Sequence, residues 1–216
     1  MYNILVLPSG FPYGGMENPC LTFATPSLLA GDRSLAFVIA HEISHSWTGN
    51  LVTNKNWENF WLNEGFTVFT QRKISEKIYG VDMANLEASV QYKSLADDIN
   101  NIGVNNTFTA LHPNVGNHDP DDAFSTVPYE KGATFLYYLQ SITSEENFQK
   151  ILQAYIKKFR LTSIDYTDWQ DHFEGQVKTL YPEEEASKII SLIDWQKWIF
   201  EPGFPPVKFE YSKSNN

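Results

Sequence analysis

The chain has 216 residues, of which 42% are hydrophobic, and it carries a formal net charge of −10 at pH 7. So acidic a surface repels phosphates and argues against a nucleic-acid-binding protein, and no run approaches the roughly 18 uninterrupted apolar residues of a membrane span. The length and apolar content allow one domain with a sizeable core, alone or with a small appendage.

A single cysteine, Cys20, excludes an intrachain disulfide and fits a reducing compartment. It lies between Pro19 and Leu21 with no evident base beside it, so we expect a buried thiol and not a nucleophile. Met1 leads directly into an apolar run that lacks the basic region and the cleavage site of a signal peptide. These features predict a cytoplasmic protein.

Two short strands are predicted near the amino terminus, at residues 2–7 and 21–25, with the turn-rich segment 8–19 between them. They belong to a predicted strand layer of residues 1–30. Residues 31–201 are predicted to form a helical lobe. The expected fold class is therefore α+β and mostly helical.

The first helices are predicted from their start and stop signals. Ser34 is a good N-cap, so a helix is expected from there to about Gly49. A second helix is predicted at residues 61–79 and a third at 82–100. Residues 101–127 are polar and interrupted by glycine and proline, which predicts a long loop of a length that is often functional.

The carboxy-terminal half is predicted to be helical as well. Further helices are predicted at residues 128–141, 165–181 and 183–193. Between the first two of these, Thr143 and Glu146 form a capping-box pair before an amphipathic stripe that we interpret as core. From Pro202 onward the composition predicts a linker, residues 202–216, that leads toward a carboxy-terminal helical domain.

Residues 41–45 read His-Glu-Ile-Ser-His, and Glu64 follows His45 after 18 intervening residues. Positions i and i+4 of a helix share one face, so His41 and His45 can direct imidazole nitrogens at the same metal ion. Glu42 lies beside that face, close to the open position of the metal. Two histidines and a later glutamate are the ligand set of a catalytic zinc site whose fourth position is left for water. The motif predicts one Zn²⁺ ion and a hydrolytic reaction.

Apolar residues surround the two histidines on the predicted helix. They are Ala36, Phe37, Ile39, Ala40 and Ile43. The histidines are therefore expected to be partly buried, where polar rings without partners are costly. A zinc ion supplies that partner, which favours a metal site over a solvated helix face that carries two histidines by chance.

Two further motifs accompany these residues, Gly14-Gly15-Met16-Glu17-Asn18 and Tyr129-Glu130-Lys131-Gly132. The combined series resembles the motifs of the zinc aminopeptidase family that includes aminopeptidase N. Longer runs at residues 47–54 and 60–65 are most similar to the leukotriene A(4) hydrolase branch of that family and its fungal relatives. The resemblance extends over nearly the whole chain, from Tyr2 to about Pro206.

The resemblance implies a thermolysin-like catalytic domain at residues 1–201, with zinc held by His41, His45 and Glu64 between the strand layer and the helical lobe. It implies that Glu42 is the general base that takes a proton from water.

The amino-terminal motif is implied to bind the substrate. Glu17 would hold the free α-amino group of a peptide, so that only the first peptide bond reaches the metal. Gly14 and Gly15 would let the backbone lie close to the substrate, with Met16 beside them.

The resemblance also implies roles for the second half of the chain. Tyr129 would donate its hydroxyl to the oxyanion of the tetrahedral intermediate, and Asp121 corresponds to an acidic residue that shapes substrate handling. Phe124 stands where the animal enzymes have tyrosine, which removes a hydroxyl near the site. The other histidines lack metal-ligand spacing and are interpreted as ordinary surface or loop residues: His112, His118 and His172.

The predicted function is zinc-dependent hydrolysis of the first peptide bond of peptides with a free amino terminus, with lipid epoxide hydrolysis as a second activity. Two alternatives remain. The first is a truncated zinc-binding fragment with little or no catalysis, because the family carries further domains. The second is a thermolysin-type endopeptidase, against which the motif at residues 14–18 argues. Apolar faces that meet other domains in the family predict a tendency to self-associate.

Overall fold

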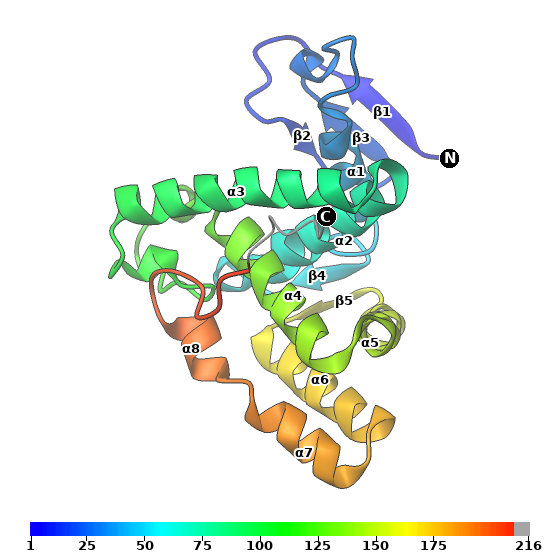
Figure 1. The fold of residues 1–216 in the computed structure, drawn as a ribbon. Helices are drawn as coiled ribbons and strands as arrows, with labels where there is room; N and C mark the ends of the chain where they lie inside the picture. The colour runs from blue at the N-terminus through cyan, green and yellow to red at the C-terminus, as the bar shows by residue number, and fades with distance from the viewer. Residues whose placement is uncertain (210–216) are drawn as a thin grey trace.

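The computed structural model describes residues 1–209, apart from the side chain of Pro120, and begins with a small sheet (Figure 1). Strand β1 (Asn3–Val6) pairs in parallel with β3 (Leu21–Ala24), whose other edge pairs antiparallel with β2 (Gly15–Met16). Two of the three strands match the predicted ones. The segment that contains β2 was predicted as turn, because two residues are too few to show the alternation that identifies a strand.

Cys20 lies in the turn before β3. Its backbone has a φ of 61° and its side chain is exposed. The prediction of a buried thiol is therefore wrong, because the short strand pair around it leaves the turn at the surface.

Helices account for most of the remaining described chain (Figure 1). They are α1 (Ala36–Ser44), α2 (Trp61–Tyr79), α3 (Val81–Ile102), α4 (Gly132–Thr143), α5 (Glu145–Phe159), α6 (Tyr166–Leu180), α7 (Glu183–Ser191) and α8 (Trp195–Phe200). The mostly helical α+β class is confirmed. The predicted capping box before α5 is wrong: Thr143 ends α4, and the side chain of Ser144 caps α5 by accepting from the Asn147 amide.

Helix α1 is shorter than predicted at both ends. It starts at Ala36, and the chain turns after Ser44 in place of continuing to Gly49. Gly49 has a φ of 119°, which belongs to the left-handed region that glycine adopts without strain. The turn ends the helix directly after the His-Glu-Ile-Ser-His motif.

Helix α2 is the centre of the lobe and packs against α1, α3 and α4. It is buried on most of its faces, so it lacks the single apolar stripe of a surface helix. Aromatic side chains of α2 and of the helices around it form the core: Trp61, Phe66, Phe135, Phe148, Trp169, Phe173 and Trp198. Residues on α2 are therefore held in fixed positions by tight packing.

A second sheet pairs β4 (Val52–Asn54) in parallel with β5 (Thr162–Ile164). Neither strand was predicted, because each has three residues and its partner lies far away in the sequence. The pair connects the segment that follows His45 to the far side of the helical lobe, where the Leu161 amide also donates to the carbonyl of Leu51.

The predicted loop at residues 101–127 contains two short 3₁₀ turns, Thr107–Thr109 and Pro120–Ala123, and ends in a π-helical turn at Val127–Lys131. Lys131 is fully buried, and its ammonium group donates to the carbonyl oxygens of Thr109, Glu201 and Gly203 at 2.9, 3.0 and 2.8 Å. This lysine joins the loop to the carboxy-terminal segment.

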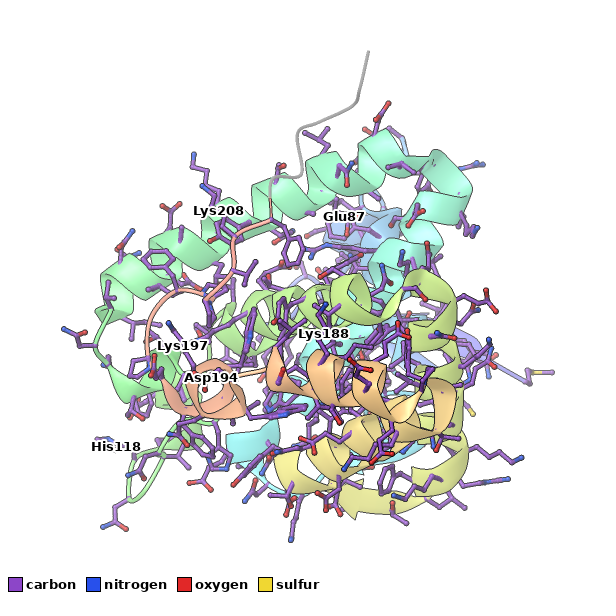
Figure 2. All side chains as sticks on the ribbon, turned by 60° about the horizontal axis from the view of Figure 1, so that its bottom comes forward. Glu87, His118, Lys188, Asp194, Lys197 and Lys208 are labelled. Carbon is purple, nitrogen blue, oxygen red and sulfur yellow. The ribbon has the colours of Figure 1, made fainter. Side chains whose placement is uncertain are left out.

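Residues 202–209 run back along the helical lobe, and Lys208 lies over the ring of Tyr92 on α3 at 5.9 Å (Figure 2). The rest of the predicted linker, residues 210–216, lies outside the described part of the chain. Among residues 1–209, no helix is both long and apolar enough to cross a membrane.

Candidate metal centre

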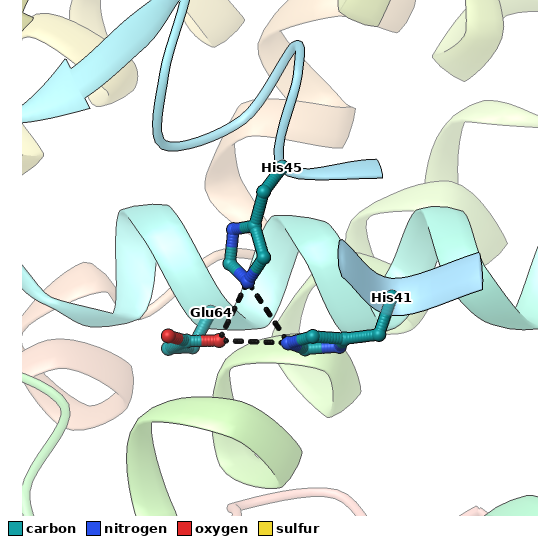
Figure 3. A group of neighbouring side chains, drawn as sticks. All are labelled: His41, His45 and Glu64. Atoms are coloured by element: carbon teal, nitrogen blue, oxygen red, sulfur yellow. Dashed lines mark hydrogen bonds and ion pairs between the residues drawn. The ribbon is translucent and has the colours of Figure 1, made fainter. Parts of the chain in front are cut away.

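Helices α1 and α2 bring His41, His45 and Glu64 together (Figure 3). The Nε2 atoms of the two histidines lie 2.9 Å apart, and Glu64 Oε2 lies 3.1 Å from the first and 3.4 Å from the second. His45 is 1% exposed, His41 14% and Glu64 5% on their side chains. The cluster is thus shielded from solvent, with His41 its most accessible member.

The His45 ring is oriented by a backbone carbonyl. Its Nδ1 lies 2.9 Å from the carbonyl oxygen of Thr48, which accepts only and so fixes the ring proton on Nδ1. The hydroxyl of Thr67 on α2 lies 3.1 Å from the same nitrogen and donates to the same carbonyl at 2.9 Å. A Cβ at Gly49 would crowd both His45 and Asn63, so this close turn requires glycine.

The His41 ring is oriented by a side chain. Its Nδ1 lies 2.9 Å from Oε1 of Gln71, the acceptor end of the amide. In both histidines Nδ1–H therefore donates to an acceptor, and both Nε2 atoms face each other and the Glu64 carboxylate, where their lone pairs are available to a cation.

Three electron-pair donors within 3.4 Å of one another need a cation between them. Two imidazole nitrogens and one carboxylate oxygen are a donor set that suits zinc. The residues present therefore fit the metal that the sequence motif predicts.

The electrostatics of the cluster also favour positive charge. Without a metal, protons on the Nε2 atoms of His41 and His45 take the place of the cation and are donated to Glu64. Burial opposes ionisation of Glu64, but these hydrogen bonds outweigh it and lower the pKa of Glu64 to about 2. Burial likewise opposes protonation of His45, but Glu64 raises the pKa of His45 to about 9. Glu64 thus stays ionised and favours a positive charge at the Nε2 atoms, whether a proton or a metal cation.

Glu42 lies beside the cluster on α1 and is 5% exposed. Its Oε2 has no hydrogen-bond partner among the described residues. Burial, partly offset by His41 and His45, raises the pKa of Glu42 to about 7. The carboxylate packs over Gly15 of β2, where any Cβ would clash with it.

This buried carboxyl group should make the metal-free chain less stable as the pH rises from 4.5, the ordinary pKa of Glu42, to about 7. The folded chain keeps the Glu42 proton in this window while the unfolded chain releases it, so folding binds more protons and stability falls with rising pH. Glu42→Gln removes the cost of ionising this carboxyl group in the folded chain, which is about 3 kcal/mol above pH 7.

Urea denaturation in the presence of a chelator, at pH 5 and at pH 8, measures this effect. The free energy of unfolding of the Glu42→Gln chain should be clearly higher than that of the parent at pH 8, and the difference should be much smaller at pH 5. The matched control is Glu184→Gln, at an exposed carboxylate on α7. If the stability of the parent and that of Glu42→Gln depended equally on pH, the raised pKa of Glu42 would be refuted.

Glu17 lies next to this cluster. Its Oε1 accepts from Asn63 Nδ2 at 3.3 Å and lies 3.9 Å from His45 Nδ1, and its side chain is 14% exposed. Asn50 Nδ2 donates to the Glu17 backbone carbonyl at 2.8 Å, which fixes the turn. Ligand atoms of Glu17, Glu42 and His45 lie within 4.8 Å of one another. A partly exposed carboxylate therefore lies beside the predicted metal position.

Tyr129 reaches the same place from the π-helical turn. Its ring stacks on His41 with centroids 6.1 Å apart and meets Phe60 and Phe124 edge-on at 6.3 and 6.2 Å. Burial, together with the negative charge of Glu64, raises the pKa of Tyr129, so its hydroxyl stays protonated. The group can therefore act as a hydrogen-bond donor throughout the neutral pH range.

Two glycines allow Tyr129 to approach Glu64. A Cβ at Gly65 would lie 2.8 Å from Gly132 Cα, and one at Gly132 would lie 2.9 Å from Gly65 Cα. Helices α2 and α4 therefore cross with their backbones in direct contact, one residue after Glu64 and three residues after Tyr129. A larger residue at either glycine must separate the two helices.

Gly65→Ala should lower the free energy of unfolding by about 1–3 kcal/mol, because the new methyl group overpacks this crossing. Gly175→Ala on α6 is the matched control, since a Cβ there has no atom within 4 Å. The control should be neutral or slightly stabilising, as alanine favours a helix. Denaturant unfolding measures the stability of both variants. Equal stability would contradict the close packing of α2 against α4 at Gly65.

The remaining predicted residues lie around the site or away from it. Gly14 and Met16 flank Gly15 at β2, a strand that contacts α1. Asp121 is exposed on the loop that leads to Phe124. His112 and His118 lie in that loop, but the prediction for His172 is wrong: it is buried on α6 and donates to the Ile151 carbonyl at 3.0 Å.

The sequence reasoning missed Thr67 and Gln71, which orient the two histidine rings. A signal was available, because both residues follow Glu64 at i+3 and i+7 and so share its helix face. This spacing alone did not identify Thr67 and Gln71, since a polar residue on a helix face is ordinarily solvated.

The chain matches the family model described as peptidase family M1 domain over residues 1–198. It is 48% identical over 211 residues to leukotriene A-4 hydrolase of Xenopus laevis, covering 97% of this chain and 34% of the relative. It is 44% identical over 205 residues to leucine aminopeptidase 2 of Emericella nidulans, covering 95% and 33%.

Solved structures give the same picture. The yeast LTA4 hydrolase in complex with bestatin superposes with a TM-score of 0.88 at 44% identity, over 96% of this chain and 33% of that one. An M1 zinc metallopeptidase from Deinococcus radiodurans has a TM-score of 0.66 at 22% identity, covering 95% of this chain and 40% of that one. At this identity the likeness concerns the fold alone. The chain spans about one third of the length of the curated relatives that it matches.

Proposed function

Since the chain belongs to the peptidase M1 family, we propose that it forms the catalytic centre of a zinc-dependent aminopeptidase, within a catalytic domain at residues 1–201. One observation carries the proposal: the Nε2 atoms of two histidines converge on the Glu64 carboxylate beside the buried carboxyl group of Glu42. This arrangement supports metal-assisted hydrolysis.

His41, His45 and Glu64 hold one zinc ion in this proposal. When bound, the ion polarises a carbonyl group and lowers the pKa of water toward about 7. Glu42 accepts a proton from the attacking water, a role that suits a carboxylate whose pKa is raised to about 7. Tyr129 donates a hydrogen bond to the oxyanion that develops on the substrate carbonyl.

Glu17 makes the site an aminopeptidase in this proposal. A partly exposed carboxylate at a fixed distance from the metal position binds the α-amino group of a peptide, so that the first peptide bond lies at the ligands. Gly14, Gly15 and Met16 form the adjacent wall in this proposal, and Asp121, exposed on the loop that leads to Phe124, contributes to substrate handling. The naming of the Emericella relative as a leucine aminopeptidase supports this substrate class.

The test combines zinc content by mass spectrometry with hydrolysis of a peptide in free and N-acetylated form. One zinc per chain and cleavage of the free peptide alone is the expected result. Equal cleavage of both peptides would mean an endopeptidase, and full zinc loading without turnover would mean a zinc-binding fragment. Glu17→Gln, which keeps the shape of the side chain, should raise the KM for the free peptide.

Tyr129→Phe should lower kcat by a factor on the order of 10²–10³, because one donor to the oxyanion is lost. KM should change little, since the hydroxyl acts on the transition state and not on the bound substrate. Steady-state kinetics on an aminoacyl anilide measure both constants. Tyr79→Phe, at an exposed tyrosine at the end of α2, is the control; a kcat loss below tenfold in Tyr129→Phe would contradict the role.

A second activity, hydrolysis of a lipid epoxide, rests on the name of the Xenopus relative. Phe124, which packs edge-on against Tyr129, stands where the animal enzymes have tyrosine, so a hydroxyl is missing there and epoxide hydrolysis is expected to be inefficient. Incubation with such an epoxide, followed by chromatography of the diol, tests this activity separately.

A further inference from the structure

Two hydrogen bonds in series connect α3 to the proposed metal ligand His41. The Gln71 side chain accepts from His41 Nδ1 through Oε1, at 2.9 Å, and donates through Nε2 to the Glu87 carboxylate. Gln71 is buried on α2, and half-buried Glu87 lies on the side of α3 that faces the lobe (Figure 2). Glu87 thus interacts with the metal centre without touching it.

The direction of the Gln71 amide decides which nitrogen of His41 carries the proton. An amide has an acceptor end and a donor end of nearly equal shape, so it can be placed either way round. With Oε1 toward the ring, Nδ1 is protonated, and the Nε2 lone pair is available to a cation beside Glu64. With the NH₂ group toward the ring, Nδ1 becomes the acceptor, the proton moves to Nε2, and the metal position is blocked.

Glu87 removes this ambiguity. An ionised carboxylate accepts only, so it holds the NH₂ end of Gln71 and leaves Oε1 for the histidine. The position of Glu87 is set by its neighbours Ala84 and Ala88, which are buried, and α3 packs along α2. His45 needs no such residue, because a backbone carbonyl already faces its Nδ1.

We propose that Glu87 is a positioning residue that sets the direction of the Gln71 amide and thereby keeps His41 in the tautomer that binds the metal. The inference rests on the proposed function only in taking His41 as a zinc ligand. It assigns to α3, outside the motifs at residues 41–64, a part in building the metal site.

Zinc affinity, measured by competition with a chromogenic chelator, tests the proposal in the full chain. Glu87→Ala should weaken zinc binding by about 10–100-fold, the usual effect of losing a residue that orients a ligand. Asp97→Asn, at an exposed carboxylate of the same helix, is the matched control and should leave affinity unchanged. Unchanged affinity in Glu87→Ala would overturn the proposal.

A charge exchange distinguishes positioning from a merely structural role. Gln71→Glu/Glu87→Gln puts the acceptor-only carboxylate on α2 and the amide on α3, so the His41 proton is again fixed on Nδ1. This double variant should bind zinc within about threefold of the parent, a small part of the 10–100-fold loss. Affinity as weak as in Glu87→Ala would overturn the proposal.

The hydrogen bond from His41 to Gln71 is measured on zinc-loaded protein by NMR. The His41 Nδ1–H proton should exchange slowly with solvent in the parent and in the double variant, and faster in Glu87→Ala, where the Gln71 acceptor is no longer held in place. Equally slow exchange in all three would overturn the inference. Failure of the proposed function is distinguishable, because it appears as absence of zinc from the parent chain.

Discussion

Glu42→Gln should lower kcat by about 10³-fold while one zinc ion stays bound, within the range for loss of a general base. The amide has the shape of the carboxylate but cannot accept the proton of the attacking water. The proposed ligands His41, His45 and Glu64 keep their mutual contacts, because Glu42 makes no hydrogen bond to any of them among the described residues.

Steady-state hydrolysis of an aminoacyl anilide and zinc content by mass spectrometry measure the two halves of this prediction. The exposed Glu184→Gln variant should retain both turnover and metal. If Glu42→Gln lost its zinc, Glu42 would be a ligand and the proposed division of roles would be wrong. If it kept more than a tenth of the parent kcat, another group would have to be the base.

Arg72→Met should produce the largest loss of stability, about 3–5 kcal/mol, because it leaves a buried carboxylate unpaired. Arg72 on α2 and Glu130 in the π-helical turn form an ion pair with Nη2–O distances of 2.7 and 2.5 Å and side-chain exposures of 1% and 6%. Glu130 follows Tyr129, so the same change should displace the tyrosine and lower kcat.

A double-mutant cycle separates the pair from its packing. Arg72→Met/Glu130→Leu removes both charges and should recover most of the lost stability, since an apolar pair avoids the desolvation cost. Denaturant unfolding of the parent, both single variants and the double variant measures the coupling. A double variant as unstable as Arg72→Met would mean that shape, and not the buried charge, decides stability here.

Local patterns predicted most of the helices, because helix propensity and the spacing of apolar residues act within a few residues of chain. The two-stranded sheet of β4 and β5 was not predicted, since Val52 pairs with Thr162 and neither strand carries a pattern of its own. The cap of α5 was misplaced by one residue for a related reason: Thr143 and Ser144 are equally suitable caps in sequence, and only the end of α4 distinguishes them.

The sequence by itself determined the ligand set, because the i, i+4 spacing of His41 and His45 is a property of any helix and Glu64 follows at a diagnostic distance. It did not determine the tautomers that make these residues ligands. Gln71, held by Glu87, sets the ring proton of His41, and the Thr48 carbonyl sets that of His45. These are contacts between separate elements.

Only the tertiary structure decided that Tyr129 lies against His41, since the glycine crossing of α2 and α4 brings together segments more than 60 residues apart. Ligand identity depends on local geometry, which the chain carries in its order of residues. Ring orientation, proton position and the approach of the tyrosine depend on non-local packing, which exists only once the core has formed.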